Sequence, residues 1–203
     1  MIQATVTPSQ QKAILRQQFK QRLAAITPDQ RRADSRLICE RICARPAWQN
    51  ARTILFFAPL PDEPDLWPLL EETLKTGRRA ALPSYLVDKD LYEAALIADA
   101  HKDLKPGRYG ILEPGPDCPR IPILNLDIIL VPGVAFSRDG YRLGRGRGYY
   151  DRLLAHARCC KWGVAFDCQL TDHLPVEARD IQLDGIATPR QWLEIPAAGA
   201  GGK

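Results

Sequence analysis

The chain has 203 residues, of which 45% are hydrophobic, so it is long enough to bury one core without a partner. Its 28 basic and 24 acidic residues give a net charge of +4, which excludes a polycation and favours an anionic small molecule about as much as nucleic acid. The first residues lack an apolar signal core, and no apolar run approaches the ~20 residues that a membrane span needs. We therefore expect a cytoplasmic protein with no membrane partner, and we expect a monomer.

The six cysteines show no CxxC pair and no histidine at zinc-binding spacing. Two of them, Cys159 and Cys160, are sequence neighbours that could not easily bridge each other. We expect reduced thiols rather than a disulfide framework.

Two helical segments open the chain. From Ser9 to about Ile26, apolar residues recur at helical spacing with basic residues between them. Thr27, Pro28 and Gln30 then have the order of an N-cap, a first-turn proline and a capping-box residue, which predicts a second helix to about Arg45. Two N-terminal helices joined by a tight turn are expected.

Strands and helices then alternate. Residues 53–58 form a short apolar run that predicts a buried strand, residues 66–75 a helix that Gly77 ends, and residues 78–83 a second strand. This order favours a parallel sheet. Residues 126–131, nearly all branched and apolar, are typical of a central parallel strand covered on both faces.

Further candidates complete the pattern: strands at 91–97, 162–166 and 181–188, and a helix from Tyr149 to about Arg158. We predict a single-domain α/β fold over residues 1–195, with an open, mostly parallel sheet flanked by helices in three Rossmann-like layers and two N-terminal helices. Residues 196–203, rich in glycine and alanine, are expected to be a disordered tail.

A glycine- and arginine-rich loop follows the central strand candidate and opens the helix at Tyr149. Alternate glycines let backbone N–H groups approach an anion closely, because no Cβ intervenes and positive φ is permitted. Arginine side chains add fixed charge with a geometry suited to phosphoryl oxygens. Asp151, in the first turn of that helix, can hold a magnesium ion that bridges phosphates. The loop therefore predicts a polyphosphate site.

This loop is neither a P-loop, because GxxxxGK[ST] is absent, nor a dinucleotide GxGxxG motif, because the spacing differs. A flexible surface loop or a disordered RNA-binding arginine–glycine tract is the alternative. Its position between a core strand and a Tyr-Tyr-Asp helix start favours phosphate binding.

The run Pro132-Gly133-Val134-Ala135-Phe136, then Gly140, then Arg142 to Asp151 and Arg152, resembles the signature of the 5-formyltetrahydrofolate cyclo-ligase family. Three further elements resemble the family in the same order: KAILR at 12–16, Pro-Asp-Glu at 61–63, and GILEP at 110–114. The resemblance extends to about Thr188, and it implies an ATP- and magnesium-dependent enzyme that acts on a folate.

The resemblance also implies roles for individual residues. ATP would be bound by Lys12, Arg16, Arg142, Leu143, Gly144, Arg145, Gly146, Arg147, Gly148, Tyr149 and Tyr150, with Arg145 and Arg147 catalytic. The folate would be bound by Ala58, Glu63, Tyr85, Tyr109 and Tyr149, and magnesium by Asp151 and Asp180. Arg179 precedes Asp180 where the family usually has histidine. Asp167 and Gln169 are expected near the site, although either could simply finish a turn.

Without the resemblance, several of these residues have ordinary explanations. Lys12 and Arg16 would form a solvated basic helix face, and Glu63 would be a loop charge. The tyrosines would be core residues. The three histidines lie outside the signature and are expected on the surface.

The reaction implied is the cyclisation of 5-formyltetrahydrofolate to 5,10-methenyltetrahydrofolate through a phosphorylated formyl group, with release of ADP and phosphate. Two alternatives stay open. A paralogue could use the same ATP site on another formyl or amide compound, or the basic loop and first helix could bind RNA with a steep salt dependence.

Overall fold

The computed structural model describes residues 7–107 and 110–196. Its α-helices are α1 (Pro8–Ala24), α2 (Pro28–Cys43), α3 (Pro46–Asn50), α4 (Trp67–Lys75) and α5 (Tyr149–Leu154). Its strands are β1 (Thr53–Leu55), β2 (Arg79–Leu86), β3 (Leu91–Ile97), β4 (Leu104–Pro106), β5 (Leu112–Pro114), β6 (Arg120–Ile121), β7 (Ile128–Val131), β8 (Ala135–Ser137), β9 (Arg142–Leu143), β10 (Cys160–Val164), β11 (Leu170–Thr171), β12 (Gly185–Ala187) and β13 (Trp192–Glu194).

The main sheet has eight strands in the order β13-β12-β10-β7-β1-β2-β3-β6. Its centre, from β12 to β2, is parallel. The outer strands β13, β3 and β6 pair antiparallel with their neighbours. The predicted mostly parallel α/β sheet is therefore confirmed, with antiparallel strands added at both edges.

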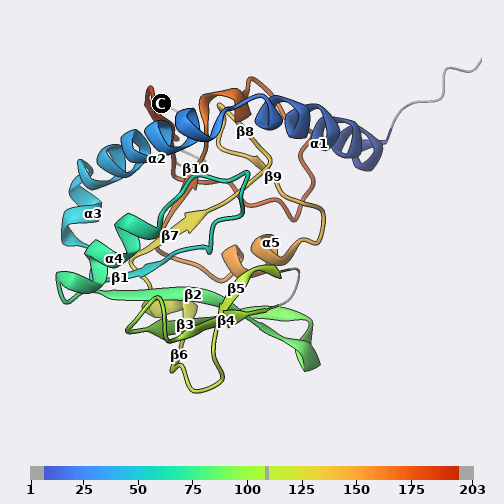
Figure 1. Cartoon of the computed structure of the whole chain (residues 1–203). Helices are drawn as coiled ribbons and strands as arrows, with labels where there is room; N and C mark the ends of the chain where they lie inside the picture. The colour runs from blue at the N-terminus through green and yellow to red at the C-terminus, as the bar shows by residue number, and fades with distance from the viewer. Residues whose placement is uncertain (1–6, 108–109, 197–203) are drawn as a thin grey trace, which may run out of the picture.

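Side chains that alternate along the central strands separate two hydrophobic layers. Ile54 and Leu130 face a core that α1 to α4 cover, while Leu55 and Ile129 face a second core closed by α5. Figure 1 shows α1, α2 and α3 following one another along one side of the molecule. Helices on both faces make the three predicted layers.

Helix α1 begins at a complete capping box, in which Thr7 and Gln10 bond each other's backbone N–H groups. The helix buries Phe19 against Val134 and against Leu143, the residue before the glycine loop (residues 144–148). This small core fixes α1 beside that loop.

Several boundaries differ from the sequence prediction. The second helix lacks a full capping box: Thr27 accepts from the Gln30 backbone, but the Gln30 side chain donates to Asp34 instead. The first strand ends at Leu55 because the chain then turns away into a proline-rich loop. Helix α5 ends at Leu154, four residues early, in tight turns that lead into β10.

The six cysteines are all unbridged, as expected. Burial raises the pKa of Cys39 to about 12, so this thiol is a weak nucleophile. Within the described ranges, none of the helices combines the length and apolar character needed to cross a bilayer. The domain boundary at residue 195 and the disorder of the tail stay predictions, because residues 197–203 lie outside the described part.

Candidate active site

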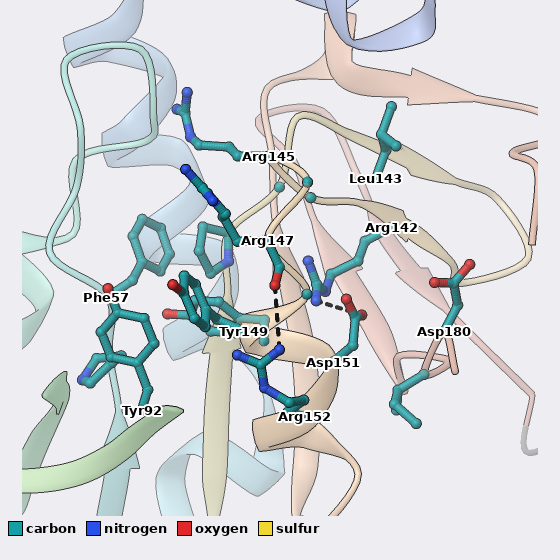
Figure 2. Close-up of a pocket in the computed structure, with 18 of the residues that line it drawn as sticks. Phe57, Tyr92, Arg142, Leu143, Arg145, Arg147, Tyr149, Asp151, Arg152 and Asp180 are labelled. Carbon is teal, nitrogen blue, oxygen red and sulfur yellow. Dashed lines mark hydrogen bonds and ion pairs between the residues drawn. The ribbon is translucent and has the colours of Figure 1, made fainter. Parts of the chain in front are cut away.

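A cavity of about 760 Å³ opens beyond the carboxyl ends of the central strands. Phe57 and Ala58, which follow β1, and Pro132 and Gly133, which follow β7, form its base. The ends of parallel strands are where ligands bind in open α/β sheets. Figure 2 shows the side chains that surround this cavity.

Most of the residues proposed from the sequence line this one cavity: Lys12, Arg16, Ala58, Glu63, Arg142, Leu143, Gly144, Arg145, Gly146, Arg147, Gly148, Tyr149, Tyr150, Asp151 and Asp180. Tyr85 does not line it but contacts a ring that does. Tyr109 lies outside the described residues. The fold thus brings together segments from α1, the loop after β1, the glycine loop and the segment before β12.

The glycine loop connects β9 to α5 along one wall. Gly146 and Gly148 have φ values of +105° and +66°, a region that residues with a Cβ adopt rarely. Arg16 of α1 donates through Nε to the carbonyl oxygen of Gly144 at 2.8 Å. The loop is therefore shaped by its glycines and fixed to the first helix.

Arg142 pairs with Asp151 at the inner end of this wall. Its guanidinium lies 2.7 Å from the carboxylate, and the arginine side chain is only 4% exposed. Burial lowers the pKa of Arg142, and the Asp151 charge opposes that effect. The Nε of Arg142 is buried with no hydrogen-bond partner in the described part of the chain, so it retains a donor beside the cavity.

A second ion pair joins residues proposed for different ligands. Lys12 Nζ lies 2.7 Å from Asp180 and 2.9 Å from Glu177. Asp180 also accepts from the backbone N–H of Glu177. Glu177, which lines the cavity, was missed from the sequence because nothing local marks a loop carboxylate as the partner of a lysine 165 residues away.

Glu63, on the loop after β1, lines the same cavity and is almost completely buried, with 8% of its side chain exposed. It accepts from the backbone N–H of Leu60 at 3.1 Å and from Arg145 at 3.1 Å. Arg145 also pairs with Asp62 at 2.7 Å. Burial raises the pKa of Glu63, although the Leu60 N–H and Arg145 both act to lower it.

The rings of Tyr92 and Tyr149 line the cavity, and Tyr85 packs against both of them. Tyr85, Tyr92 and Tyr149 pack edge to face, with ring centroids 5.1 to 5.6 Å apart. Tyr92 is directly opposite Tyr85 in the β2–β3 pair and was not identified from the sequence. Only the register of the β2–β3 pair places Tyr92 beside Tyr85, and predicting each strand separately does not give that register.

Tyr150 follows in the same helix and also lines the cavity. Its hydroxyl is buried and, within the described residues, has no hydrogen-bond partner. Burial strongly raises its pKa, so the hydroxyl keeps its proton.

Carboxylates suited to magnesium are few. In residues 7–107 and 110–196, no group of three or more His, Cys, Asp or Glu side chains lies close enough to hold a metal ion by itself. Asp151 and Asp180 both line the cavity beside basic residues. Magnesium commonly takes one or two protein carboxylates and completes its shell with substrate phosphates and water, so this oxygen donor set fits that ion when a polyphosphate is bound.

Asp167 and Gln169 do not line the cavity. They form a 3-10 turn after β10, in which the Gln169 side chain accepts from Phe166 and donates to the carbonyl of Gly133. The turn explanation for these two residues is therefore correct. The three histidines are exposed, as expected.

The chain matches the model of the 5-formyltetrahydrofolate cyclo-ligase family over residues 8–189. It is 35% identical to the 5-formyltetrahydrofolate cyclo-ligase of Escherichia coli K12 over 182 residues, which covers 87% of this chain and 99% of the relative. It is 30% identical to the mouse 5-formyltetrahydrofolate cyclo-ligase over 196 residues, with 90% and 96% covered.

Solved structures agree. The Aquifex aeolicus 5,10-methenyltetrahydrofolate synthetase superposes with a TM-score of 0.83 at 31% identity, covering 95% of this chain and 96% of that one. The corresponding Mycoplasma pneumoniae protein gives a TM-score of 0.70 at 27% identity, with 88% and 98% covered. The chain therefore belongs to the 5-formyltetrahydrofolate cyclo-ligase family.

Proposed function

We propose that this protein cyclises 5-formyltetrahydrofolate to 5,10-methenyltetrahydrofolate, converting ATP to ADP and phosphate. The observation that supports this most directly is the contact between Arg145 and Glu63. It joins a basic glycine loop, suited to polyphosphate, to a buried carboxylate beside tyrosines, suited to a planar ring with N–H donors. Two such subsites in one cavity fit a reaction that transfers phosphate onto a folate.

The chemistry requires an activated formyl group, because an amide carbon is a poor electrophile and its oxygen a poor leaving group. In the proposed reaction the formyl oxygen attacks the γ-phosphorus of ATP and displaces ADP, giving an iminium phosphate. The folate N10 then attacks the formyl carbon, and phosphate leaves with the former formyl oxygen. A proton is lost from N10 as the ring closes.

The glycine loop would bind the triphosphate. Backbone N–H groups from Gly144 to Gly148 and the side chains of Lys12, Arg16 and Arg147 would surround its oxygens. Arg145, between the two subsites, would neutralise charge on the transferring phosphate. Because α5 has only six residues, we assign most of this binding to the loop and its cations rather than to a helix dipole.

The folate would bind on the other wall. The Glu63 carboxylate would accept from the pterin N–H groups, with Ala58 beside it at the base of the cavity. The rings of Tyr92 and Tyr149 would pack against the folate, and Tyr85 would support them from behind. This arrangement directs the formyl group toward the glycine loop.

Asp151 and Asp180 would hold magnesium together with the phosphates. When bound, the ion would neutralise the developing phosphate charge. Arg142 pairs with Asp151, and Lys12 pairs with Asp180, so each carboxylate already has a basic partner. Both basic residues keep the carboxylates at the cavity wall.

The residues proposed for ATP and for the folate line one cavity of a single chain, and we propose a monomeric enzyme. We also propose that it acts in the cytoplasm. RNA binding is less well supported, because Arg145 and Lys12 face carboxylates within the cavity rather than forming an open basic surface.

The test follows the absorbance of the conjugated methenyl product, with and without ATP, while ADP is measured in parallel. We expect one ADP for each methenylfolate and no product without ATP. Turnover with another formyl or amide compound, but not with 5-formyltetrahydrofolate, would support the paralogue instead.

A further inference from the structure

The hairpin between β2 and β3 contains a residue in a rare conformation. Asp90 has φ +48° and ψ +42°, and it is the one non-glycine residue with positive φ in the described part of the chain. Such conformations are unfavourable for residues with a Cβ and persist where surrounding contacts hold them, often at functional sites. The contacts of Asp90 therefore require an explanation.

Asp90 bonds one tyrosine of β2 and a tyrosine and an arginine of α5. Its Oδ1 accepts from the hydroxyls of Tyr85 and Tyr149, the latter at 3.1 Å. Its backbone oxygen accepts from Arg152 at 2.7 Å, and the Arg152 guanidinium also lies 3.8 Å from Oδ2. One hairpin residue thus contacts α5 through both its side chain and its backbone.

Tyr149 and Arg152 lie where the proposed ATP and folate subsites meet. Tyr149 directly follows the last glycine of the loop, and its ring packs against Tyr85 and Tyr92. Arg152 lies 4.9 Å from the centre of the Tyr149 ring and also donates to the carbonyl of Arg147 at 3.5 Å. Figure 2 shows Arg152 between Tyr149 and Asp151, with the bond to Arg147 dashed.

We propose that Asp90 is a positioning residue for phosphoryl transfer. This inference rests on the proposed function. Asp90 holds the Tyr149 ring and the Arg152 side chain so that the tyrosines proposed to bind the folate and the end of the glycine loop keep a fixed separation. In-line transfer depends on that separation, and a displacement of about 1 Å can cost on the order of 100-fold in rate. Asp90 acts through Tyr149 and Arg152 and does not itself contact the reacting atoms.

The alternative is that Asp90 only stabilises the hairpin. Asp90→Gly distinguishes the two roles, because glycine adopts positive φ readily while the carboxylate is lost. We expect this variant to be at least as stable as the unmodified protein, yet to lose about 10-fold or more in kcat. We also expect a several-fold rise in the KM for the folate and a smaller change in the KM for ATP.

Asp88→Asn is the matched control, since it removes the same charge from the same turn, and we expect kcat and both KM values within about twofold of the unmodified protein. A double-mutant cycle between Asp90→Gly and Tyr149→Phe adds a readout that simple stabilisation would not move. Tyr149→Phe removes the hydroxyl that Asp90 accepts from. The double variant should therefore lose much less activation free energy, measured from kcat, than the sum of the two single losses.

The experiment measures kcat, both KM values and the unfolding free energy for the four proteins of the cycle and the control. Full activity of Asp90→Gly, equal loss in Asp88→Asn, or additive losses in the cycle would each overturn the positioning role while leaving the proposed function in place. If the unmodified protein forms no methenylfolate at all, the proposed function fails, and this inference fails with it.

Discussion

The guanidinium of Arg145, from the glycine loop, lies 3.1 Å from the buried carboxylate of Glu63, from the loop after β1. The resemblance found in the sequence implied different ligands for these residues, ATP for Arg145 and the folate for Glu63. Their contact links the two subsites: if Arg145 turns toward phosphate, Glu63 is left buried without its cation. Pterin N–H donors would then satisfy it.

We therefore expect the two substrates to strengthen each other's binding. A non-hydrolysable ATP analogue should lower the Kd for 5-formyltetrahydrofolate by about fivefold or more, and the folate should lower the Kd of the analogue equally. Titration calorimetry measures both. Arg145→Gln should abolish the coupling, because it removes the cation that pairs with buried Glu63.

Asp62→Asn provides the control for this coupling. Asp62 pairs with the same arginine, but its side chain is 34% exposed, against 8% for Glu63. Its loss should leave the coupling in place. Independent binding of the two ligands to the unmodified protein would contradict the account.

Glu63→Gln should stabilise the folded protein at neutral pH and weaken folate binding. Burial raises the pKa of Glu63, so its charged form is unfavourable in the folded protein, and the neutral variant should be more stable at neutral pH. A carboxyl with a raised pKa contributes stability that is present below its ordinary value of 4.5 and is lost as the pH rises through the folded value. The advantage of the variant should therefore shrink as the pH falls toward 4.5.

Chemical denaturation across this pH range measures the effect, and folate binding to the same variant should weaken by about 10-fold or more. The opposite result would be a variant that is less stable than the unmodified protein at neutral pH, with a difference that shrinks on acidification. It would show that the charged carboxylate stabilises the folded protein.

Gly146→Ala should impair ATP use. Gly146 has φ +105°, so alanine would be strained there, although an added Cβ would meet Arg16 only at an ordinary contact distance of 3.5 Å. We expect the ATP KM to rise by at least about 10-fold through displaced backbone donors. Gly77→Ala is the control, because Gly77 has φ +74° in open space at the end of α4.

Both glycine variants should lose about 1 kcal/mol of stability, measured by denaturation. Only Gly146→Ala should change the ATP KM. Equal kinetic effects in both would mean that general destabilisation, not the shape of the loop, was responsible.

Asp151→Asn should raise the magnesium concentration needed for half-maximal turnover by about 10-fold or more. Asparagine retains an oxygen acceptor for buried Arg142, so we expect a loss of about 1 to 3 kcal/mol in stability rather than unfolding. Turnover measured against magnesium at saturating ATP, with circular dichroism as the folding check, tests this. An unchanged magnesium requirement would exclude Asp151 as a ligand.

Local chemistry explains what could be predicted from the sequence. Alternate glycines, basic side chains and a preceding apolar strand marked the loop from Arg142 to Asp151, because each feature acts within a few residues. Period and composition likewise predicted the central strands and both N-terminal helices. The boundaries moved where tertiary packing, not propensity, decided them, as at the early end of α5.

Long-range pairing explains what could not be predicted. Lys12 and Asp180 meet across 168 residues, and Arg145 and Glu63 across 82. Tyr92 became part of the site only through its register opposite Tyr85. No local pattern contains these relationships, because they arise from the packing of α1 and of loops that are far apart in the sequence, and from the pairing of β2 with β3.

The central claim is that the formyl oxygen attacks ATP within this cavity. It is tested most directly by 5-formyltetrahydrofolate labelled with ¹⁸O in the formyl group, with the released phosphate analysed by mass spectrometry. The account predicts one ¹⁸O atom in each inorganic phosphate and none in ADP. Unlabelled phosphate, formed together with methenylfolate, would contradict it, because the formyl oxygen would then have left without ever being bonded to phosphorus.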